Sequence, residues 1–294
     1  MSIWWLAIRP KTLAAACCPV VIGIMLAYAE KAIHWPSVWV ILITALLIQI
    51  GTNFANDYYD FIKGADTADR KGPTRATQAG LVTPETMKRA MKITFGLAFM
   101  FGLILVFRGG WPILLIGCLS ILFGVLYTGG PYPLAYIGLG DVFVFVFFGP
   151  VAVAGTYYLM TQNMSWMAAW IGMGPGLIST ALLAVNNLRD IDEDKVANKR
   201  TLAVRWGAGF AKMEFITCLV LAIHVPIVAM IAYDLSPMLL ITILAVFPAG
   251  YLVKECLTKT GEALNGLLAK TGAFLIVYTL LFVMASLIPF SPLR

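Results

Sequence analysis

The chain has 294 residues, of which 60% are hydrophobic and 12% charged, and its mean hydropathy is +0.86. A soluble protein carries about 25% charged residues, so the composition excludes a soluble enzyme and predicts an integral membrane protein. The net charge is +6, but the basic side chains lie beside apolar segments and alternate with acidic ones, which argues against a nucleic-acid-binding surface. Hydrophobic segments continue from end to end, so we expect one transmembrane domain over residues 1–294.

A helix needs about 20 mostly apolar residues to cross the hydrocarbon core of a bilayer. The turn TGGPYPL (128–134) and the polar segment TQNMSW (161–166) divide two longer apolar stretches. The fold class that follows is an all-α bundle of nine transmembrane helices, with no cleaved signal peptide. The predicted helices cover about residues 12–30, 37–55, 88–107, 111–127, 139–160, 166–187, 211–232, 236–254 and 268–288.

Nine helices determine which connections share a side of the membrane. The N-terminus and the connections after the second, sixth and eighth helices hold, with their flanks, 18 of the 21 lysine and arginine residues. The other side holds only Lys31, Arg108 and Arg294. Basic residues accumulate in cytoplasmic loops, so we expect a cytoplasmic N-terminus and cytoplasmic connections in a cell's inner membrane.

The first acidic motif, NFANDYYDFIKGAD (53–66), follows the second predicted helix. Asn53, Asn56, Asp57 and Asp60 recur at intervals of three and four residues, which places them on one helical face. Asp66 follows in the loop. A carboxylate near the bilayer costs roughly 3 kcal/mol, so a chain that retains several there is expected to use them.

The second motif, NNLRDIDED (186–194), follows the sixth predicted helix and therefore lies on the same side. Asn186, Asp190 and Asp194 are each four residues apart, which again predicts one stripe. Asp192 and Glu193 point away from that stripe and are expected in solvent, as is Asp69 of the first loop.

Basic residues follow each motif within a short distance, as Arg70, Lys71 and Arg75 after the first and Lys195, Lys199, Arg200 and Arg205 after the second. Hard oxygen ligands without histidine or cysteine suit Mg²⁺, which binds through a few carboxylates and substrate phosphates. Carboxylates, Mg²⁺ and cationic side chains together can stabilise a departing diphosphate. The alternative is two ordinary charged, solvated loops.

The spacings NxxxDxxxxxD over Asn56, Asp60 and Asp66 and NxxxDxxxD over Asn186, Asp190 and Asp194 resemble those of the UbiA superfamily of intramembrane prenyltransferases. Longer stretches are similar to the branch of that superfamily that prenylates 1,4-dihydroxy-2-naphthoate in menaquinone synthesis. These stretches are RPKTL (9–13), DRKGPTRATQAG (69–80), YTGGPYPLAYIGLGD (127–141) and NKRTLAVRWG (198–207).

The resemblance implies a cytoplasmic-side cavity in which two Mg²⁺ ions bind a polyprenyl diphosphate between the motifs. It implies transfer of the polyprenyl group to the naphthoate with loss of CO2 and diphosphate, giving demethylmenaquinol. Asp60 and Asp190 would be catalytic. The metal ligands it implies are Asp57, Asp60, Asp66, Asp190 and Asp194. The substrate-binding residues are Asn53, Asn56, Lys71, Arg75, Asn186, Lys199 and Arg200.

Loss of diphosphate leaves an allylic cation, which must be shielded from water and can be stabilised by aromatic faces. Tyr127 is the catalytic candidate for this role, and the other candidates are Phe54, Tyr58, Tyr132 and Tyr136. Arg9 and Lys11 could bind the naphthoate carboxylate, or could instead set the orientation of the first helix.

Two other functions stay open. The acceptor could be 4-hydroxybenzoate, homogentisate, haem or a lipid glycerol instead of the naphthoate. The protein could also be a membrane transporter, but a transporter is expected to place ionisable residues near the middle of its helices. In this chain Asp, Glu, Lys and Arg keep to the membrane-proximal ends of the predicted helices.

Overall fold

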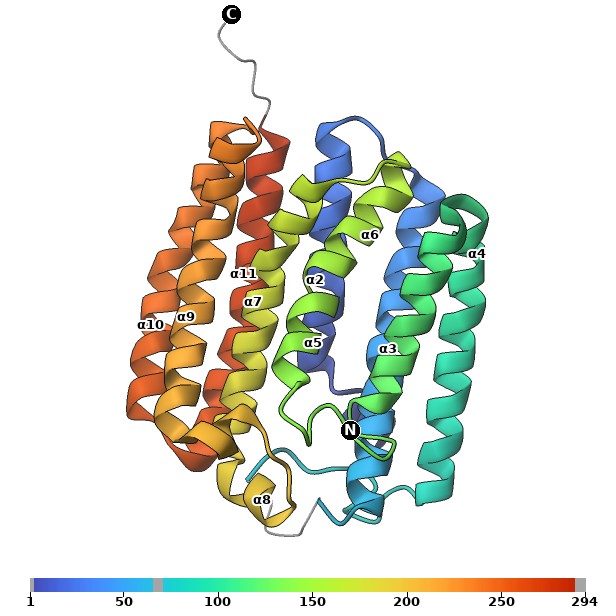
Figure 1. Cartoon of the computed structure of the whole chain (residues 1–294), viewed down its shortest axis with the longest axis vertical. Coiled ribbons are helices and arrows are strands. Elements are labelled where there is room, and N and C mark those ends of the chain that lie inside the picture. The colour runs from blue at the N-terminus through green and yellow to red at the C-terminus, as the bar shows by residue number, and fades with distance from the viewer. Residues whose placement is uncertain (1–2, 66–70, 289–294) are drawn as a thin grey trace, which may run out of the picture.

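A computed structural model describes residues 3–65 and 71–288 of the chain. Asp66 and Asp69 lie outside the described residues, as does Arg70. All elements in the described part are helices, arranged as an upright bundle (Figure 1). Within the described residues, eight helical segments, three of them formed by two consecutive elements, are long and apolar enough to cross a membrane. The predicted class, an all-α membrane bundle, is therefore confirmed.

The N-terminal half contains four helices, α1 (Ile3–Ile8), α2 (Pro10–Ala29), α3 (Trp35–Ile62) and α4 (Pro84–Leu126). The predicted second helix ended at residue 55, whereas α3 continues to Ile62 and carries the first acidic motif. The motif is therefore helical, as its spacing indicates.

A break at Gly110 divides α4 into two arms that run in opposite directions (Figure 1). Gly110 has a φ of 65°, a left-handed conformation that glycine adopts without the steric cost of a Cβ atom. The arms correspond to the predicted helices 88–107 and 111–127, although α4 counts as one of the eight candidate spans. The total of nine crossings remains a prediction.

The middle of the chain forms α5 (Gly140–Phe147), α6 (Pro150–Thr161), α7 (Trp166–Arg189) and α8 (Ile191–Val196). The predicted helix 139–160 is interrupted at Gly149, whose backbone is not helical (φ −125°, ψ −109°) and which precedes Pro150, the first residue of α6. A Cβ atom at Gly149 would lie 2.7 Å from the carbonyl oxygen of Gly172. The short helix α8 was not predicted, and it carries the end of the second motif.

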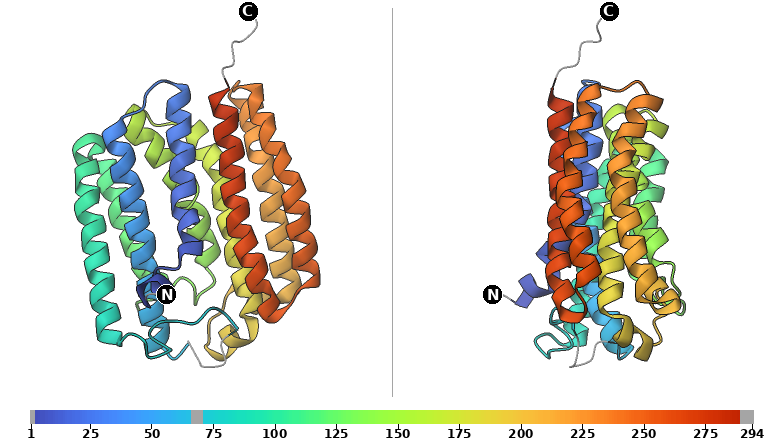
Figure 2. Two further views of the ribbon diagram at one scale, coloured as in Figure 1. Left: turned by 180° about the vertical axis from the view of Figure 1, so that it is seen from behind. Right: turned by 90° about the vertical axis from the view of Figure 1, so that its left-hand side faces the viewer.

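The C-terminal part forms α9 (Leu202–Ala232), the 3₁₀ helix η1 (Pro237–Ala245), α10 (Val246–Thr258), η2 (Gly261–Ala263) and α11 (Leu264–Leu287). Seen from behind, α2 lies between α3 and α11 (Figure 2). Both acidic motifs end at the same end of the bundle, near the N-terminus and α8 (Figure 1).

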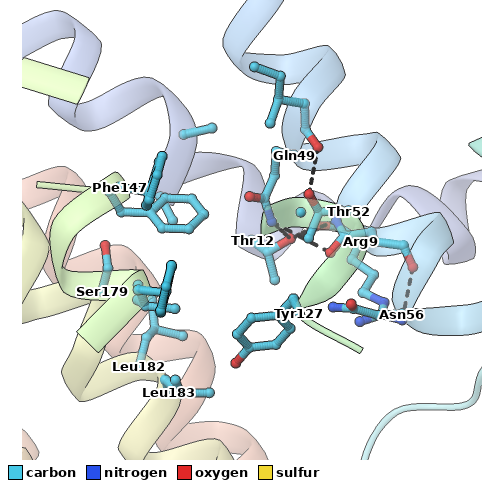
Figure 3. A pocket seen from close by; sticks show the side chains of 18 of the residues that line it. Arg9, Thr12, Gln49, Thr52, Asn56, Tyr127, Phe147, Ser179, Leu182 and Leu183 are labelled. Atoms are coloured by element: carbon cyan, nitrogen blue, oxygen red, sulfur yellow. Dashed lines mark hydrogen bonds between the residues drawn. The ribbon is translucent and has the colours of Figure 1, made fainter. Parts of the chain in front are cut away.

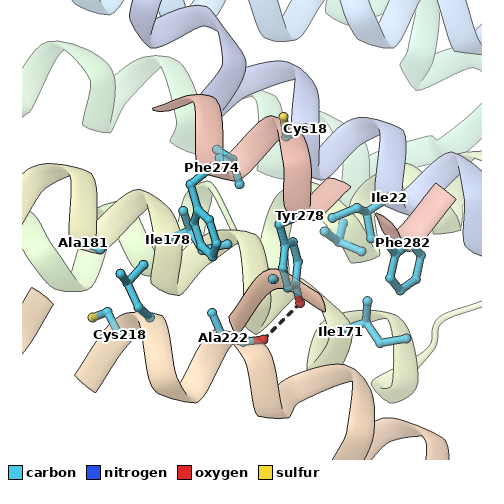
Figure 4. Close-up of a cluster of buried hydrophobic side chains, with 14 of the residues drawn as sticks. Cys18, Ile22, Ile171, Ile178, Ala181, Cys218, Ala222, Phe274, Tyr278 and Phe282 are labelled. Carbon is cyan, nitrogen blue, oxygen red and sulfur yellow. Dashed lines mark hydrogen bonds between the residues drawn. The ribbon is translucent and has the colours of Figure 1, made fainter. Parts of the chain in front are cut away.

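The larger apolar core lies where α2, α7, α9 and α11 converge (Figure 4). Tyr278 is fully buried there, and its hydroxyl donates to the carbonyl oxygen of Ala222 at 3.1 Å. A second cluster around Met87 and Phe95 joins α3 and α4.

Candidate active site

A cavity of about 680 Å³ is lined mainly by residues of the helices from α2 to α7. One end of the cavity is polar and the other end is apolar. The polar end is lined by both acidic motifs and reaches Arg75 and Lys199. The apolar end extends along the helices to Leu105, Ile113 and Leu159. Figure 3 shows Thr12, Gln49 and Asn56 on one wall and Phe147, Ser179 and Leu183 on the other, with Tyr127 between them.

Asp60 lies at the centre of the polar end, and its side chain is 2% exposed. The Tyr136 hydroxyl donates to Asp60 Oδ1 at 3.0 Å, and Lys199 Nζ lies 3.3 Å from the same oxygen. Arg75 Nη2 lies 3.6 Å from Asp60 Oδ2. The Asp60 carboxylate therefore contacts two cations, Arg75 from the loop after the first motif and Lys199 from the loop after the second.

Lys199 connects the two motifs directly. Its Nζ atom lies 3.3 Å from Asp60 of the first motif and 3.9 Å from Asp194 Oδ1 of the second. All three side chains are largely buried. Two acidic motifs more than a hundred residues apart in the sequence thus meet around one ammonium group, as expected if they share a substrate.

The second motif bends between two helices. The four-residue spacing predicts that Asn186, Asp190 and Asp194 form one stripe, whereas α7 ends at Arg189 and α8 begins at Ile191. The amide of Asp190 still donates to Asn186 O at 3.1 Å, and that of Asp194 to Asp190 O at 2.8 Å. The bend therefore preserves the four-residue spacing, and all three residues line the cavity.

Asp57, which the sequence predicts as a metal ligand, is not among the residues that line the cavity. Its carboxylate oxygens accept the backbone N–H groups of Ala76 and Thr77, both at 3.1 Å. The residue is 1% exposed. Asp57 therefore anchors the loop that follows the motif, a task that requires the same residue type as metal binding.

Two predicted substrate-binding residues also lie away from the cavity lining. Lys71 is partly exposed, and its Nζ contacts Asp192 at 2.9 Å. This pairing raises the pKa of Lys71 and lowers that of Asp192. Arg200 is exposed, and its backbone carbonyl accepts Arg205 Nε at 2.9 Å. Glu193 was expected in solvent but lines the cavity, where it accepts the Lys71 backbone N–H at 2.7 Å.

Arg9 and Lys11 both line the cavity, as does Asn53. Arg9 has a φ of 53° at the junction of α1 and α2. Asn53 holds this junction, because its Nδ2 donates to Ile8 O at 2.8 Å and to Thr12 Oγ1 at 3.0 Å. Asn53 therefore supports the position of Arg9. Asn56 has a separate partner, because its Oδ1 accepts a hydrogen bond from the Thr128 hydroxyl at 3.0 Å.

Tyr127 is the one predicted aromatic candidate that lines the described cavity. Burial raises the pKa of its phenol above the usual value of about 10, and the carboxylates of Asp141, Asp60 and Asp194 act in the same direction. Its hydroxyl group is therefore neutral. The sequence prediction missed Phe143, Phe147 and Phe148, which line the cavity from α5 and the residue after it.

Arg189 was also missed as a site residue, since its charge was counted only toward orientation. Its guanidinium group is buried against Asp190, with two N–O distances of 2.6 Å. The signal that could have identified Arg189 as a site residue was its position inside the motif NNLRD (186–190).

The donors at the polar end fit Mg²⁺ in kind, because they are carboxylate and amide oxygens without histidine or cysteine. Within residues 3–65 and 71–288, no three His, Cys, Asp or Glu side chains are grouped closely enough to hold a metal ion by themselves. Mg²⁺ keeps several waters and binds through one or two carboxylates plus phosphates. The arrangement therefore suits an ion that arrives with a phosphorylated substrate.

Residues 16–269 match the model of the UbiA prenyltransferase family, and the chain belongs to this family. The transporter alternative is thereby set aside. The chain is 37% identical to the 1,4-dihydroxy-2-naphthoate octaprenyltransferase of Escherichia coli strain K12, over 96% of this chain and 94% of that protein. It is 38% identical to the Mycobacterium tuberculosis protein of that name, over 78% of each chain.

The fold is similar to that of a UbiA homolog from Archaeoglobus fulgidus bound to GPP and Mg²⁺, with a TM-score of 0.68 and 12% identity. The similarity covers 98% of this chain and all of that one.

Proposed function

We propose that this protein transfers a polyprenyl group from a polyprenyl diphosphate to 1,4-dihydroxy-2-naphthoate, releasing diphosphate and CO2 and giving demethylmenaquinol. The observation that supports it most is the contact of Lys199 with Asp60 and Asp194, one from each motif, at the polar end of an apolar cavity. A diphosphate with a hydrocarbon tail has the same division into an anionic and an apolar part.

In this proposal Lys199 and Arg75 bind diphosphate oxygens, while Asp60, Asp190 and Asp194 bind Mg²⁺, two ions in all. Mg²⁺ held by these carboxylates would supply neutralisation of the charge that develops on the leaving diphosphate. The polyprenyl tail occupies the apolar end of the cavity. Tyr127 and the nearby phenylalanines exclude water from the allylic cation and present aromatic faces to it.

The naphthoate binds near the N-terminal junction, where Arg9 and Lys11 supply cations for its carboxylate. After the bond to diphosphate has broken, the ring carbon that carries the carboxylate forms a bond to the allylic cation. The carboxylate then leaves as CO2, and its electron pair restores the aromatic ring, so no base has to remove a ring proton.

The direct test is an assay with the purified protein, a polyprenyl diphosphate, dihydroxynaphthoate and Mg²⁺. We expect prenylated product and an equal amount of CO2, and neither after chelation of the metal. Transfer to 4-hydroxybenzoate, homogentisate, haem or a lipid glycerol, with none to the naphthoate, would refute the assigned acceptor but leave the donor chemistry intact.

The same assay tests on which side of the membrane the active site lies. The accumulation of basic residues at the end of the bundle that holds both motifs favours a cytoplasmic active site in the inner membrane. Inverted sealed vesicles should then convert substrates added outside, and right-side-out vesicles should not. The opposite result would reverse the orientation.

A further inference from the structure

Arg189 and Asp190 meet because the helix ends between them. Consecutive residues of a continuous helix point in different directions. Asp190 ends α7 with φ −97° and ψ 11°, and the chain turns into α8. The turn brings the Asp190 carboxylate onto the guanidinium group of its neighbour.

The contact between them is bidentate and buried. Arg189 Nε lies 2.6 Å from Asp190 Oδ1, and Nη2 lies 2.6 Å from Oδ2. The two side chains are 1% and 7% exposed. A planar fork of this kind fixes the orientation of a carboxylate as well as its charge.

The remaining donors of the guanidinium group reach two other elements. Nη2 also donates to Asn186 Oδ1, and Nη1 donates to Asn265 Oδ1 of α11, both at 2.8 Å. Asn265 Nδ2 in turn donates to the backbone carbonyl of Lys71 at 2.9 Å. One side chain therefore links the second motif to α11 and to the segment that follows the first motif.

We propose that Arg189 is a positioning residue for the metal–diphosphate site. It fixes Asp190 so that the carboxylate binds a metal ion through one oxygen and not as a chelate. It turns Asn186 so that the amide nitrogen is left for the substrate. Through Asn265 it holds the segment that follows the first motif close to the second motif. This inference rests on the proposed function, because the site it organises is the one assigned there.

The physical basis is the number of lone pairs. The fork uses one lone pair of each Asp190 oxygen, and a carboxylate oxygen has a second lone pair, on the side away from Arg189, through which a metal ion would be bound. Octahedral Mg²⁺ accepts such a single-oxygen ligand and demands near-ideal geometry. An arginine has only donors, so it must bond the oxygen of Asn186 and leave Nδ2, an N–H donor suited to a phosphate oxygen.

The test compares Arg189→Lys with Arg108→Lys. Arg108 is a matched control, because its guanidinium group donates to two backbone carbonyls, Leu159 O at 2.7 Å and Met160 O at 2.8 Å, away from the motifs. Binding of Mn²⁺ would be measured by paramagnetic resonance with a non-cleavable prenyl thiolodiphosphate present. We expect Arg189→Lys to weaken Mn²⁺ binding by about 10- to 100-fold and Arg108→Lys to leave it unchanged. Wild-type or tighter binding in Arg189→Lys would overturn the proposal.

Two further variants keep the test decisive if Arg189→Lys does not fold. Asn186→Asp replaces the N–H donor by an anionic oxygen, so it should weaken binding of the thiolodiphosphate, and unchanged or tighter binding would contradict the assigned amide orientation. Asn265→Ala should increase hydrogen exchange in residues 71–82 while Asp190 stays paired. Unchanged exchange there would refute the link between the motifs.

These measurements need no acceptor. A wild-type protein that forms no prenylated naphthoate would refute the proposed function without affecting the binding results. A wild-type protein that does form it, with Arg189→Lys equal to wild type in Mn²⁺ affinity, would refute only the positioning role.

Discussion

Asp57 and Asp60 lie three residues apart on α3, and their carboxylates have different partners. Asp57 accepts two backbone N–H groups of the following loop. Asp60 faces the cavity and three polar side chains, Tyr136, Lys199 and Arg75. One acidic motif therefore contains a residue that shapes the loop and a residue that faces the cavity.

Asp57→Asn and Asp60→Asn are expected to separate these roles. An amide can accept only one of the two N–H groups at Asp57, so this variant should lose about 1–3 kcal/mol of unfolding free energy. Asp60→Asn should lower turnover by about 10²-fold or more, with a smaller change in stability. Thermal unfolding and turnover would be measured on both. A stable Asp57→Asn protein with no metal binding would restore Asp57 as a ligand.

The sequence could place most of the site residues but could not say which of their oxygens are already bonded. The helical spacing of Asn53, Asn56, Asp57 and Asp60 was sufficient to predict a common stripe. The burial of Asp57 under residues 76 and 77 depends on how the loop returns to α3, and no local pattern encodes that. Arg189 was overlooked for a similar reason, since its contact with Asp190 requires the helix to end there.

At the scale of elements, α4 forms one wall of the cavity where the polyprenyl tail is expected. Gly96 and Gly102 both belong to its first arm, and a Cβ atom at either would meet no atom within 4 Å. Gly102 lines the cavity, whereas Gly96 is exposed on the outside of the bundle. The two glycines therefore form a matched pair of positions.

Gly102→Leu should shift the preference toward shorter prenyl donors. A leucine side chain would occupy space along the tail, so kcat/KM for a long donor should fall by roughly tenfold or more relative to a short one. Gly96→Leu adds the same side chain outside the cavity and should leave the ratio unchanged. Equal ratios in both variants would show that the tail does not pass Gly102.

Helix boundaries were predicted best where a local residue sets them. The break at Gly110 falls between the predicted helices 88–107 and 111–127. Glycine marks this position because it tolerates the positive φ of the turn. The break at Gly149 was missed, although the sequence FFGP (147–150) contained its signal. Pro150 lacks the backbone N–H that a continuous helix would use, and Gly149 also lies against α7, a tertiary contact.

At the scale of the whole molecule, one amphipathic cavity lies beside two apolar cores. The acidic motifs come from separate regions of the chain and meet at one end of this cavity. The bundle places them there because α3 and α7 end at the same side (Figure 1). The function proposed here depends on this convergence more than on any single residue.

The most direct test is a structure determined with Mn²⁺ and the non-cleavable prenyl thiolodiphosphate. We predict the metal ions and the diphosphate between Asp60 on one side and Asp190 and Asp194 on the other. The tail should extend toward Leu159, and Lys199 should contact a phosphate oxygen. A diphosphate bound to one motif alone, or outside the cavity, would contradict the account.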